Sequence, residues 1–322
     1  MILALARQLR NAGVLGINRR NAEFLSRCNP RALYPRVDDK VLTKQLAGAQ
    51  GIPIPRLLLV IERTAEIRGF EERLQGTQEF ALKPARGCQG SGIVLITKRV
   101  QAGFVTTSGE VISPEDLAYH ISSILSGIFS LAGLADRAIL EELIHPDPVF
   151  AALTYRGVPD IRIVVYRGVP VMGMIRLPTR ASDGKANLHR GALGAGIDLG
   201  RGTTLSAVCR DRVVTHHPDT GAAVRGLLVP HWPTMLHLAA RCYELAGLGY
   251  LGVDLVLDEQ RGPLLLELNA RPGLAIQLAN ESGLLERLQR VDAAPGRLFE
   301  SAESRAAWAM ETFQASQVSV TE

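Results

Sequence analysis

Short apolar runs bounded by turn residues recur along the chain and predict β-strands, and longer stretches with helical spacing of apolar residues lie between them. Strands are expected at 56–61, 79–83, 93–96, 138–144, 161–166, 169–176, 253–257 and 264–268, and helices at 1–27, 40–50, 67–74, 114–131, 233–245 and 275–288. The strands form two groups, 56–96 and 138–268, each with its own helices. This grouping predicts an α+β fold of two lobes with a cleft between them, rather than one wound parallel sheet.

Three segments leave more than one interpretation open. The segment 180–204 is rich in glycine and polar residues and is too long for a simple turn, which is typical of a functional or disordered loop. The uncharged run 117–135 favours a buried helix, with a membrane span as the alternative. The helix at 1–27 is expected to pack on its own domain rather than on a membrane or a partner.

Composition adds the expected class of protein and its compartment. The 322 residues, 47% hydrophobic and 21% charged, are those of an ordinary soluble globular protein. A net charge of +4 without long basic runs does not suggest nucleic-acid binding, and a polyanionic small ligand fits equally well. Four widely separated cysteines and the lack of a clear signal peptide favour a reducing, cytoplasmic location without zinc or a disulfide framework.

A hairpin at 252–273 carries acidic side chains on strands that are otherwise apolar. If its turn is symmetric, Asp254 lies opposite Glu267, and Asn269 points to the same face because it is two residues farther along the strand. Two facing carboxylates repel each other, and burial increases that penalty. A cation removes the penalty, and these oxygen ligands are of the kind that Mg²⁺ takes. The alternative is a solvated hairpin face whose acids are incidental.

Residues 80–93 (FALKPARGCQGSGI) combine a strand that ends near Lys83, a glycine-rich loop and a second strand. Glycines let successive backbone N–H groups curve around phosphate oxygens, and a lysine adds a point charge. Because a strand follows the loop, it is neither a Walker A loop nor a dinucleotide fingerprint. Glycine count alone favours a glycine-rich hairpin turn as the alternative. Lys83, one of only five lysines among 36 basic residues, strengthens the case for phosphate binding.

Two arginines on consecutive predicted strands are a further candidate pair. Arg162 and Arg176 flank a turn at 167–168, so antiparallel pairing can bring them to one face, where arginine matches phosphate or carboxylate. The segment 141–144 (EELI) could offer backbone atoms to an adenine edge, although an ordinary strand end is the simpler interpretation.

The long loop carries its own polar cluster, Asn187, His189 and Arg190. His189 suits a positioning role better than acid–base work. The chain shows no nucleophile elbow and no HExxH motif. The candidate groups are metal ligands, cationic side chains and backbone amides that could bind phosphates. Such a set of groups is typical of phosphoryl transfer.

Taken in order, these motifs resemble those of ATP-grasp proteins, and they are similar to the α-L-glutamate ligase branch that includes the ribosomal-protein glutamate ligase. The resemblance covers roughly residues 36–285. The matching pieces are Asp39-Lys40 with 51–55 (GIPIP), Lys83 with its loop, 141–144, Asp160-Ile161-Arg162, Arg176, 187–191 (NLHRG), and 252–254 (GVD) through 267–273 (ELNARPG). The resemblance implies an ATP-grasp fold with the nucleotide in the cleft between two α+β lobes.

The resemblance also implies roles for individual residues. Lys40, Lys83 and the loop residues Gly87, Gln89, Gly90, Ser91 and Gly92 would contact the phosphates of ATP, and Glu141, Glu142, Leu143 and Ile144 would hold the adenine. Asp254, Glu267 and Asn269 would bind Mg²⁺ (or Mn²⁺), and Arg162, Arg176 and Arg190, with Asn187 and His189, would act at the reacting groups. Arg271 could bind an extra anionic group of the substrate or pair with Glu267.

The expected domains are a short N-terminal helical segment (1–39), an N-lobe with the phosphate loop (40–137), a C-lobe with the metal and substrate site (138–290) and a C-terminal tail (291–322). Relatives of this family usually carry a full domain before the first lysine, and here only about 39 residues precede Lys40. We therefore expect a homo-oligomer, in which a second subunit completes the substrate site.

The expected activity is that of an ATP- and Mg²⁺-dependent carboxylate–amine ligase. It forms an amide or peptide bond through an acyl phosphate and uses glutamate or another amino acid, with a small-molecule or peptide carboxylate as the other substrate. Neither nucleic-acid binding nor stable membrane insertion is expected. The alternatives are a nucleotide-binding regulatory or scaffold protein without ligase turnover, and an ATP-grasp phosphotransferase.

Overall fold

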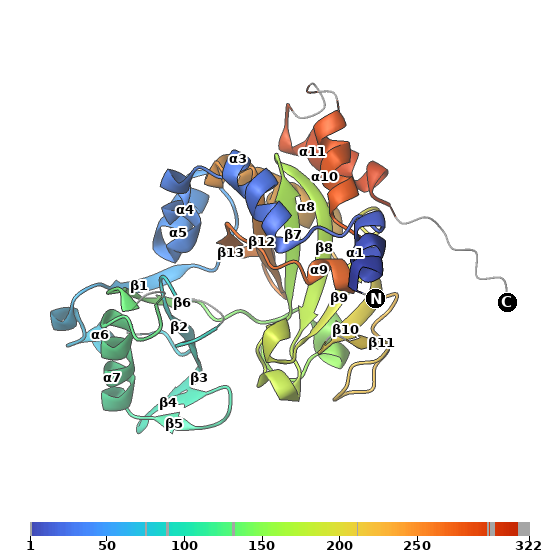
Figure 1. Cartoon of the computed structure of the whole chain (residues 1–322). Helices are drawn as coiled ribbons and strands as arrows, with labels where there is room; N and C mark the ends of the chain where they lie inside the picture. Colours follow the sequence, from blue (N-terminus) through green and yellow to red (C-terminus); the bar gives the residue numbers. More distant parts are fainter. Residues whose placement is uncertain are drawn as a thin grey trace. The chain divides into compact units, whose positions relative to one another are not determined.

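The computed structural model describes residues 2–74, 76–87, 90–130, 133–210, 212–294, 296 and 300–314. The chain divides into two compact units, a smaller one at Asp38–His145 and a larger one made of Met1–Val37 with Pro146–Glu322. Figure 1 labels their helices and strands, and each unit is described by itself. Both are built on antiparallel sheets with helices packed against them, so the fold is α+β.

The smaller unit is a six-stranded sheet in the order β1-β6-β2-β3-β4-β5. The strands are β1 (Leu57–Ile61), β2 (Phe80–Pro84), β3 (Val94–Val100), β4 (Gly103–Thr106), β5 (Val111–Ile112) and β6 (Ala138–Glu141), and the helices are α5 (Lys40–Ala49), α6 (Phe70–Arg73) and α7 (Pro114–Leu125). Strand alternation gives the sheet two faces. Phe80 and Leu82 join the core with α6 and α7, whereas Ile139 packs on the other side against Val41 of α5. Lys83 and Glu141 therefore point to the α5 face.

The larger unit is a seven-stranded sheet in the order β11-β10-β9-β8-β7-β12-β13. Its strands are β7 (Asp160–Tyr166), β8 (Val169–Leu177), β9 (Leu193–Ile197), β10 (Thr204–Cys209), β11 (Arg212–Val214), β12 (Tyr250–Asp258) and β13 (Gly262–Asn269). Helices α8 (Trp232–Ala246) and α11 (Ala302–Thr312) pack on each other and on β8, and α9 (Ile276–Ala279) and α10 (Leu285–Ala293) also contact β8. Strands β7 and β12 are buried almost throughout, so their polar residues are held rigidly.

The N-terminal segment belongs to the larger unit. It consists of α1 (Ile2–Asn11), α2 (Ile17–Arg19), a π-helical stretch at Arg20–Leu25, α3 (Ser26–Cys28) and α4 (Pro35–Asp38), the last of which reaches the start of the smaller unit. Asn29 exchanges hydrogen bonds of 2.7 and 2.8 Å with the backbone of Tyr250. The continuous helix predicted at 1–27 is wrong, because Gly13 adopts a φ of 68° and ends α1.

Three further expectations differ from the structure. The sequence pattern places the strand at 138 in the second group, but β6 pairs with β1 and β2 in the sheet of the smaller unit. The segment 180–204 contains β9, a buried strand between β8 and β10, rather than loop alone. The helix expected at 275–288 is two helices, α9 and α10.

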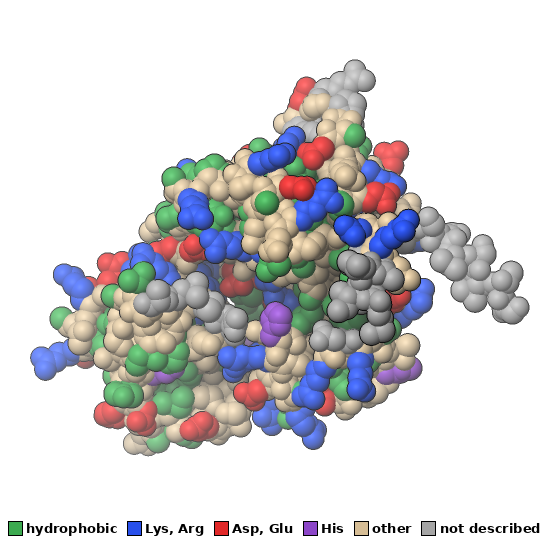
Figure 2. All heavy atoms as spheres, in the orientation of Figure 1, with side chains coloured by type: hydrophobic (Ala, Val, Ile, Leu, Met, Phe, Trp, Pro, Cys, Tyr) green, Lys and Arg blue, Asp and Glu red, His purple; other side chains and the backbone are tan. Residues whose placement is uncertain are grey.

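The uncharged run that starts at residue 117 forms the buried side of α7. Leu117, Ile121 and Ile124 are fully buried in the core of the smaller unit. Within the described residues, no helix is long and apolar enough to cross a bilayer. On the face shown in Figure 2, Lys and Arg side chains are interspersed with Asp and Glu side chains.

Candidate functional site

A row of charged residues crosses four adjacent strands of the larger unit. Asp254 of β12 pairs in register with Glu267 of β13 on one side and with Arg162 of β7 on the other, and Asp160 of β7 pairs with Arg176 of β8. The facing of Asp254 and Glu267 that the hairpin pattern predicted is confirmed. Alternation along each strand brings these side chains to one face of the sheet.

Asp254 is fully buried and is neutralised by both arginines. Arg162 donates Nε and Nη2 to the two Asp254 carboxylate oxygens at 2.7 and 2.6 Å, and Arg176 Nη2 donates to Oδ2 at 2.7 Å. Arg176 also holds Asp160 with its Nε and Nη2. The two acids and two arginines form a buried network, in which bidentate geometry fixes the position of Asp254.

Glu267 and Asn269 lie on the half-buried edge of this network. Asn269 Nδ2 is 3.2 Å from Asp254 Oδ2 and 3.4 Å from Glu267 Oε1, so the three side chains expected to bind a metal do converge. Among the described residues, no group of three or more His, Cys, Asp or Glu side chains could hold a metal ion. A metal at this edge would therefore need the amide of Asn269 beside the two carboxylates.

The donor set fits a hard cation such as Mg²⁺. Carboxylate and amide oxygens are its preferred ligands, and rotation of the Asn269 amide presents oxygen in place of nitrogen to the two acids. Burial alone would raise the pKa of Asp254, and the charges of Arg162 and Arg176 outweigh that effect and hold the pKa well below its usual range. Asp254 is thus a carboxylate, as a metal ligand must be.

The pKa values of the two buried acids are shifted in opposite directions. Burial and the neighbouring Asp254 raise the pKa of Asp160 to about 7, although Arg176 opposes this. Burial would lower the pKa of Arg176, and the carboxylates of Asp160 and Asp254 raise it above its ordinary value. Arg176 is therefore a permanent cation that joins both acids.

In the smaller unit, Lys83 is ion-paired with Glu141, and Lys44 of α5 is ion-paired with the same carboxylate at 2.8 Å. Glu141 is 1% exposed. Its burial would raise its pKa, and the charges of Lys83 and Lys44 outweigh this and lower the pKa below the ordinary value. Glu141 therefore serves as a buried anion, whereas Glu142, Leu143 and Ile144 follow the strand end and are half-buried.

This buried carboxylate gives a testable dependence of stability on pH. Because the pKa of folded Glu141 lies below the ordinary value of 4.5, its contribution to the free energy of unfolding is present above about pH 4.5 and is lost as the pH falls through the folded pKa. We expect the urea midpoint of Glu141→Gln to fall less steeply below this pH than that of the wild type. Glu142→Gln is the control, because its partner Arg56 is 72% exposed. Parallel acid profiles for Glu141→Gln and wild type would contradict the assignment.

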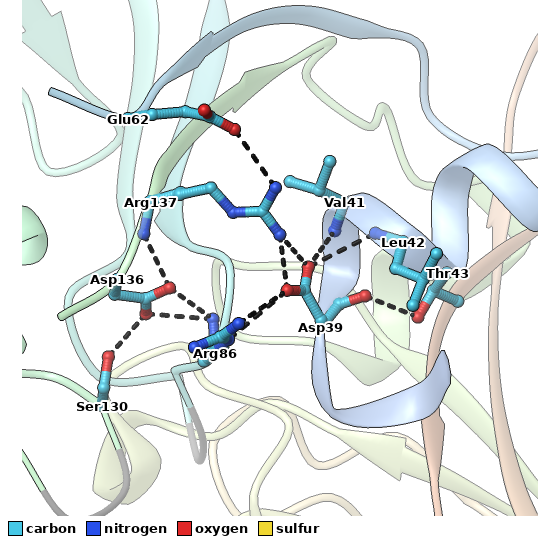
Figure 3. Close-up of polar contacts among 9 residues, drawn as sticks. All are labelled: Asp39, Val41, Leu42, Thr43, Glu62, Arg86, Ser130, Asp136 and Arg137. Carbon is cyan, nitrogen blue, oxygen red and sulfur yellow. Dashed lines mark hydrogen bonds and ion pairs between the residues drawn. The ribbon is translucent and has the colours of Figure 1, made fainter. Parts of the chain in front are cut away.

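The root of the glycine-rich loop is fixed by two buried aspartates (Figure 3). Asp136 accepts hydrogen bonds from the backbone N–H of Arg86 at 3.0 Å and of Arg137 at 2.8 Å, and from Ser130. Asp39 caps α5 and binds the guanidinium groups of Arg86 and Arg137. The chain therefore enters the loop in one defined position.

Beyond its root, the loop has backbone conformations that favour glycine. Gly90 and Gly92 have φ of 70° and 74°, and a Cβ on Gly92 would come within 2.6 Å of the Phe129 ring. Lys40 Nζ donates to the Gly87 carbonyl at 2.8 Å, and His120 Nε2 lies 2.9 Å from the Gly92 carbonyl. Ser91 is half-buried, and Gln89 lies outside the described residues.

Removal of the Asp136 carboxylate should destabilise the protein. Asp136→Ala leaves two backbone N–H groups without their acceptor, and an unsatisfied buried donor costs about 1–3 kcal/mol. We expect the free energy of unfolding in urea to fall by about 2–3 kcal/mol. Glu72→Ala, at an exposed position of α6, should change it by less than about 0.5 kcal/mol. Equal effects of the two substitutions would show that Asp136 does not hold the loop.

The remaining candidates occupy loops of the larger unit. Asn187 caps a short 3-10 helix, Leu188–Arg190, by accepting from the His189 N–H at 3.0 Å, and His189 and Arg190 are exposed. Arg271 is exposed, and its guanidinium carbon lies 5.3 Å from the centre of the Tyr34 ring. The pairing of Arg271 with Glu267 stays a prediction, as does its contact with an anionic group of a substrate.

A model of the sugar-transfer associated ATP-grasp family matches residues 19–293. This range includes the charged network around Asp254 and the two lysines that pair with Glu141. The chain belongs to this family. The prediction of an ATP-grasp protein is therefore confirmed, and the two antiparallel sheets of the chain are consistent with that fold. The family match begins at Arg19, and so extends farther toward the N-terminus than the resemblance over 36–285 that the sequence motifs indicate.

Relatives of this ATP-grasp chain include a probable α-L-glutamate ligase of Sodalis glossinidius (strain morsitans) and a ribosomal protein bS6–L-glutamate ligase of Salmonella paratyphi B. Each is 26% identical over 246 residues, which are 76% of this chain and 60% of the relative. The chain thus spans less than two thirds of the length of these relatives. Solved structures that it resembles include the D-cycloserine synthetase DcsG (18% identity, TM-score 0.46, covering 84% of this chain and 78% of that one). Another is the D-alanine–D-alanine ligase of Bacillus anthracis (12% identity, TM-score 0.43, covering 87% and 68%).

Two residues of these clusters were missed by sequence reasoning. Lys44 was not given a role, although it is one of five lysines and lies one helical turn after Lys40. No role is predicted for Asp160 from the sequence, although its spacing from Arg162 places both on one face of a strand. The signal for each was a charged residue in an otherwise apolar setting.

Proposed function

We propose that this ATP-grasp chain is an ATP- and Mg²⁺-dependent carboxylate–amine ligase. The observation that carries the proposal is the convergence of Asp254, Glu267 and Asn269 beside Arg162 and Arg176 on one face of the larger unit's sheet. Hard oxygen ligands next to arginines suit a triphosphate and its metal. The glutamate ligases similar to this chain support the reaction class.

The reaction would proceed in two balanced steps. A carboxylate oxygen of the acceptor attacks the γ-phosphorus of ATP, and the bond between this phosphorus and the oxygen that bridges it to the β-phosphate breaks. The products are ADP and an acyl phosphate. An amine nitrogen then attacks the carbonyl carbon, inorganic phosphate leaves with one oxygen from the original carboxylate, and the nitrogen loses a proton. Stabilisation of phosphate charge is the main task of the protein in both steps.

The residues divide this task according to their chemistry. Lys40, Lys83 and the backbone N–H groups at Gly87, Gly90, Ser91 and Gly92 would bind the phosphates, and the segment 141–144 would hold the adenine through backbone atoms. Asp254, Glu267 and Asn269 would hold the divalent cation, which when bound supplies positive charge to the phosphate oxygens. Arg162, Arg176 and Arg190 would orient the γ-phosphate and the acceptor carboxylate. Asn187 and His189 would position the loop that carries Arg190.

The acceptor is proposed to be an anionic small molecule or peptide, with glutamate or another amino acid as the other substrate. Arg271 supports an anionic substrate, because its described contact is the Tyr34 ring, and an exposed guanidinium on an aromatic ring keeps its donors available. The name of the family mentions sugar transfer, so sugar acids belong in any acceptor panel.

The experiment that tests the proposal is ADP release by the purified protein with ATP, Mg²⁺ and mixtures of amino acids, peptides and sugar acids. We expect release that depends on both a carboxylate and an amine, with an amide product found by mass spectrometry. Release that needs neither would contradict it.

A second candidate function is a nucleotide-binding protein without turnover. The observation that favours it is the occupation of both oxygens of Asp254 by arginine donors, which compete with a metal. Tight ATP binding without any amide or phosphorylated product across the acceptor panel would support this second candidate.

A further inference from the structure

One carboxylate in the smaller unit is shared by two lysines from different elements. Glu141 of β6 is ion-paired with Lys83 of β2 and with Lys44 of α5. All three side chains are buried, with exposures of 1% for Glu141 and 5–6% for the lysines. Two cations therefore share one buried acid. Buried charges are costly, so the presence of two lysines on the same carboxylate calls for an explanation.

The two lysines are held differently. Lys44 Nζ also donates to the Pro55 carbonyl at 2.9 Å, which fixes its ammonium group between β6 and the segment that leads into β1. Lys83 is the next-to-last residue of β2, and the glycine-rich loop begins three residues later. Of the two, Lys83 is the lysine that stands at the entrance of the loop, and Lys44 is the one anchored from two sides.

We propose that Lys44 is a positioning residue that keeps Glu141 neutralised while Lys83 turns from Glu141 to the phosphates of a nucleoside triphosphate. This inference rests on the proposed function, which assigns Lys83 to the phosphates. Without Lys44, the departure of Lys83 would leave a buried carboxylate unpaired, and that is among the most unfavourable events in a protein interior. With Lys44 present, Glu141 keeps one cation throughout, and Lys83 is free to exchange partners.

Asp39 is a second acid that is shared by two cations, one of which lies at the start of the glycine-rich loop. Asp39 is shared by Arg137, whose Nη2 lies 2.5 Å away, and by Arg86, whose contacts are 3.3 Å long (Figure 3). The Arg86 side chain is 49% exposed and belongs to the loop, whereas the Arg137 side chain is 26% exposed and lies beside β6. Here too one acid holds two cations, one nearer the loop and one farther from it. The repetition supports an arrangement in which the cation nearer the loop exchanges partners while the other keeps the acid neutralised.

The test compares the binding of MgATP and of adenosine by calorimetry, since only MgATP carries phosphates. In Lys44→Met, Glu141 holds Lys83 alone in a neutral pair, so the fold should persist. We expect MgATP to bind about 100-fold more weakly and adenosine to change by less than about threefold. In Lys44→Met combined with Glu141→Gln, no buried carboxylate is left to retain Lys83, and MgATP affinity should return to within about tenfold of wild type. Lys98→Met, at an exposed position of β3, is the control that removes one charge from the same unit.

Each outcome separates the inference from the proposed function on which it rests. If wild type binds MgATP no more tightly than adenosine, or if Lys83→Met leaves MgATP binding intact, the phosphate assignment fails and this inference with it. If that assignment holds, an unchanged MgATP affinity in Lys44→Met overturns the inference. The inference is also overturned if Lys44→Met weakens the binding of adenosine as much as that of MgATP. It is overturned as well if adding Glu141→Gln to Lys44→Met does not restore MgATP affinity. Either result indicates that Lys44 has a purely structural role. Should Lys44→Met unfold, Lys44→Arg keeps the charge and must retain wild-type binding within about fivefold.

Discussion

Replacement of Asp254 by alanine is expected to lower the free energy of unfolding by about 3–5 kcal/mol. The carboxylate is fully buried and accepts three hydrogen bonds from Arg162 and Arg176. Its removal leaves Arg162 without its acid, while Arg176 keeps Asp160. A buried guanidinium that loses its partner cannot be solvated in place, so the folded state bears the full penalty. Urea unfolding of the full chain measures the effect.

A double substitution tests this explanation. Because the penalty arises from the uncompensated Arg162, Asp254→Ala with Arg162→Met should be more stable than Asp254→Ala alone by about 1–3 kcal/mol. A loss below about 1 kcal/mol in the single variant, or no recovery in the double variant, would show that the network does not stabilise the fold.

Glu267→Gln is expected to have the opposite profile, with a large effect on turnover and a small effect on folding. Glu267 is half-buried at the edge of the network, so the neutral isostere should change the free energy of unfolding by less than about 1 kcal/mol. If Glu267 holds the divalent cation, the loss of its charge removes several kcal/mol of stabilisation from the phosphoryl-transfer transition state. ATP turnover should fall by about 1000-fold.

The matched control lies in the same hairpin. Glu259 is exposed in the turn between β12 and β13, and Glu259→Gln changes the net charge by the same amount at a position outside the network. It should retain wild-type turnover and stability. Full turnover in Glu267→Gln, or an equal loss in Glu259→Gln, would remove Glu267 from the metal site.

Much of the sheet and its polar face could be predicted from the sequence. The hairpin was recognisable because β-rich runs flank a turn with Gly262-Pro263, and the period of two along a strand then placed Asp254 opposite Glu267. The same reasoning brought Arg176 to the strand next to Arg162. These predictions succeeded because register follows from local spacing once a tight turn is identified.

The partners of the charged side chains could not be predicted in this way. The hairpin acids suggested a cation as the remedy for their repulsion, whereas in the structure two arginines from β7 and β8 neutralise Asp254. Likewise, Lys83 was expected to face phosphates, and its partner in the structure is Glu141, which lies 58 positions farther along the chain. Such contacts depend on strand order, and no short-range pattern encodes strand order.

Strand β9 was missed for a different reason. Its sequence, Leu193-Gly194-Ala195-Gly196-Ile197, lacks the β-branched and aromatic alternation by which strands are recognised. Close packing requires the glycine at 196, because a Cβ on Gly196 would come within 2.5 Å of the Ala279 carbonyl oxygen on α9. A tertiary contact therefore determined the composition of this strand and concealed it from sequence analysis.

If the chain activates a carboxylate with ATP, the activated group can be trapped chemically. The protein, ATP and Mg²⁺ are incubated with a metabolite extract and hydroxylamine, and hydroxamates are sought by mass spectrometry, with Glu267→Gln as the matched sample. We expect a hydroxamate that requires ATP and the wild-type protein and is lost with Glu267→Gln. ADP release that yields neither a hydroxamate nor an amide, or that leaves a stable phosphorylated product, would contradict it.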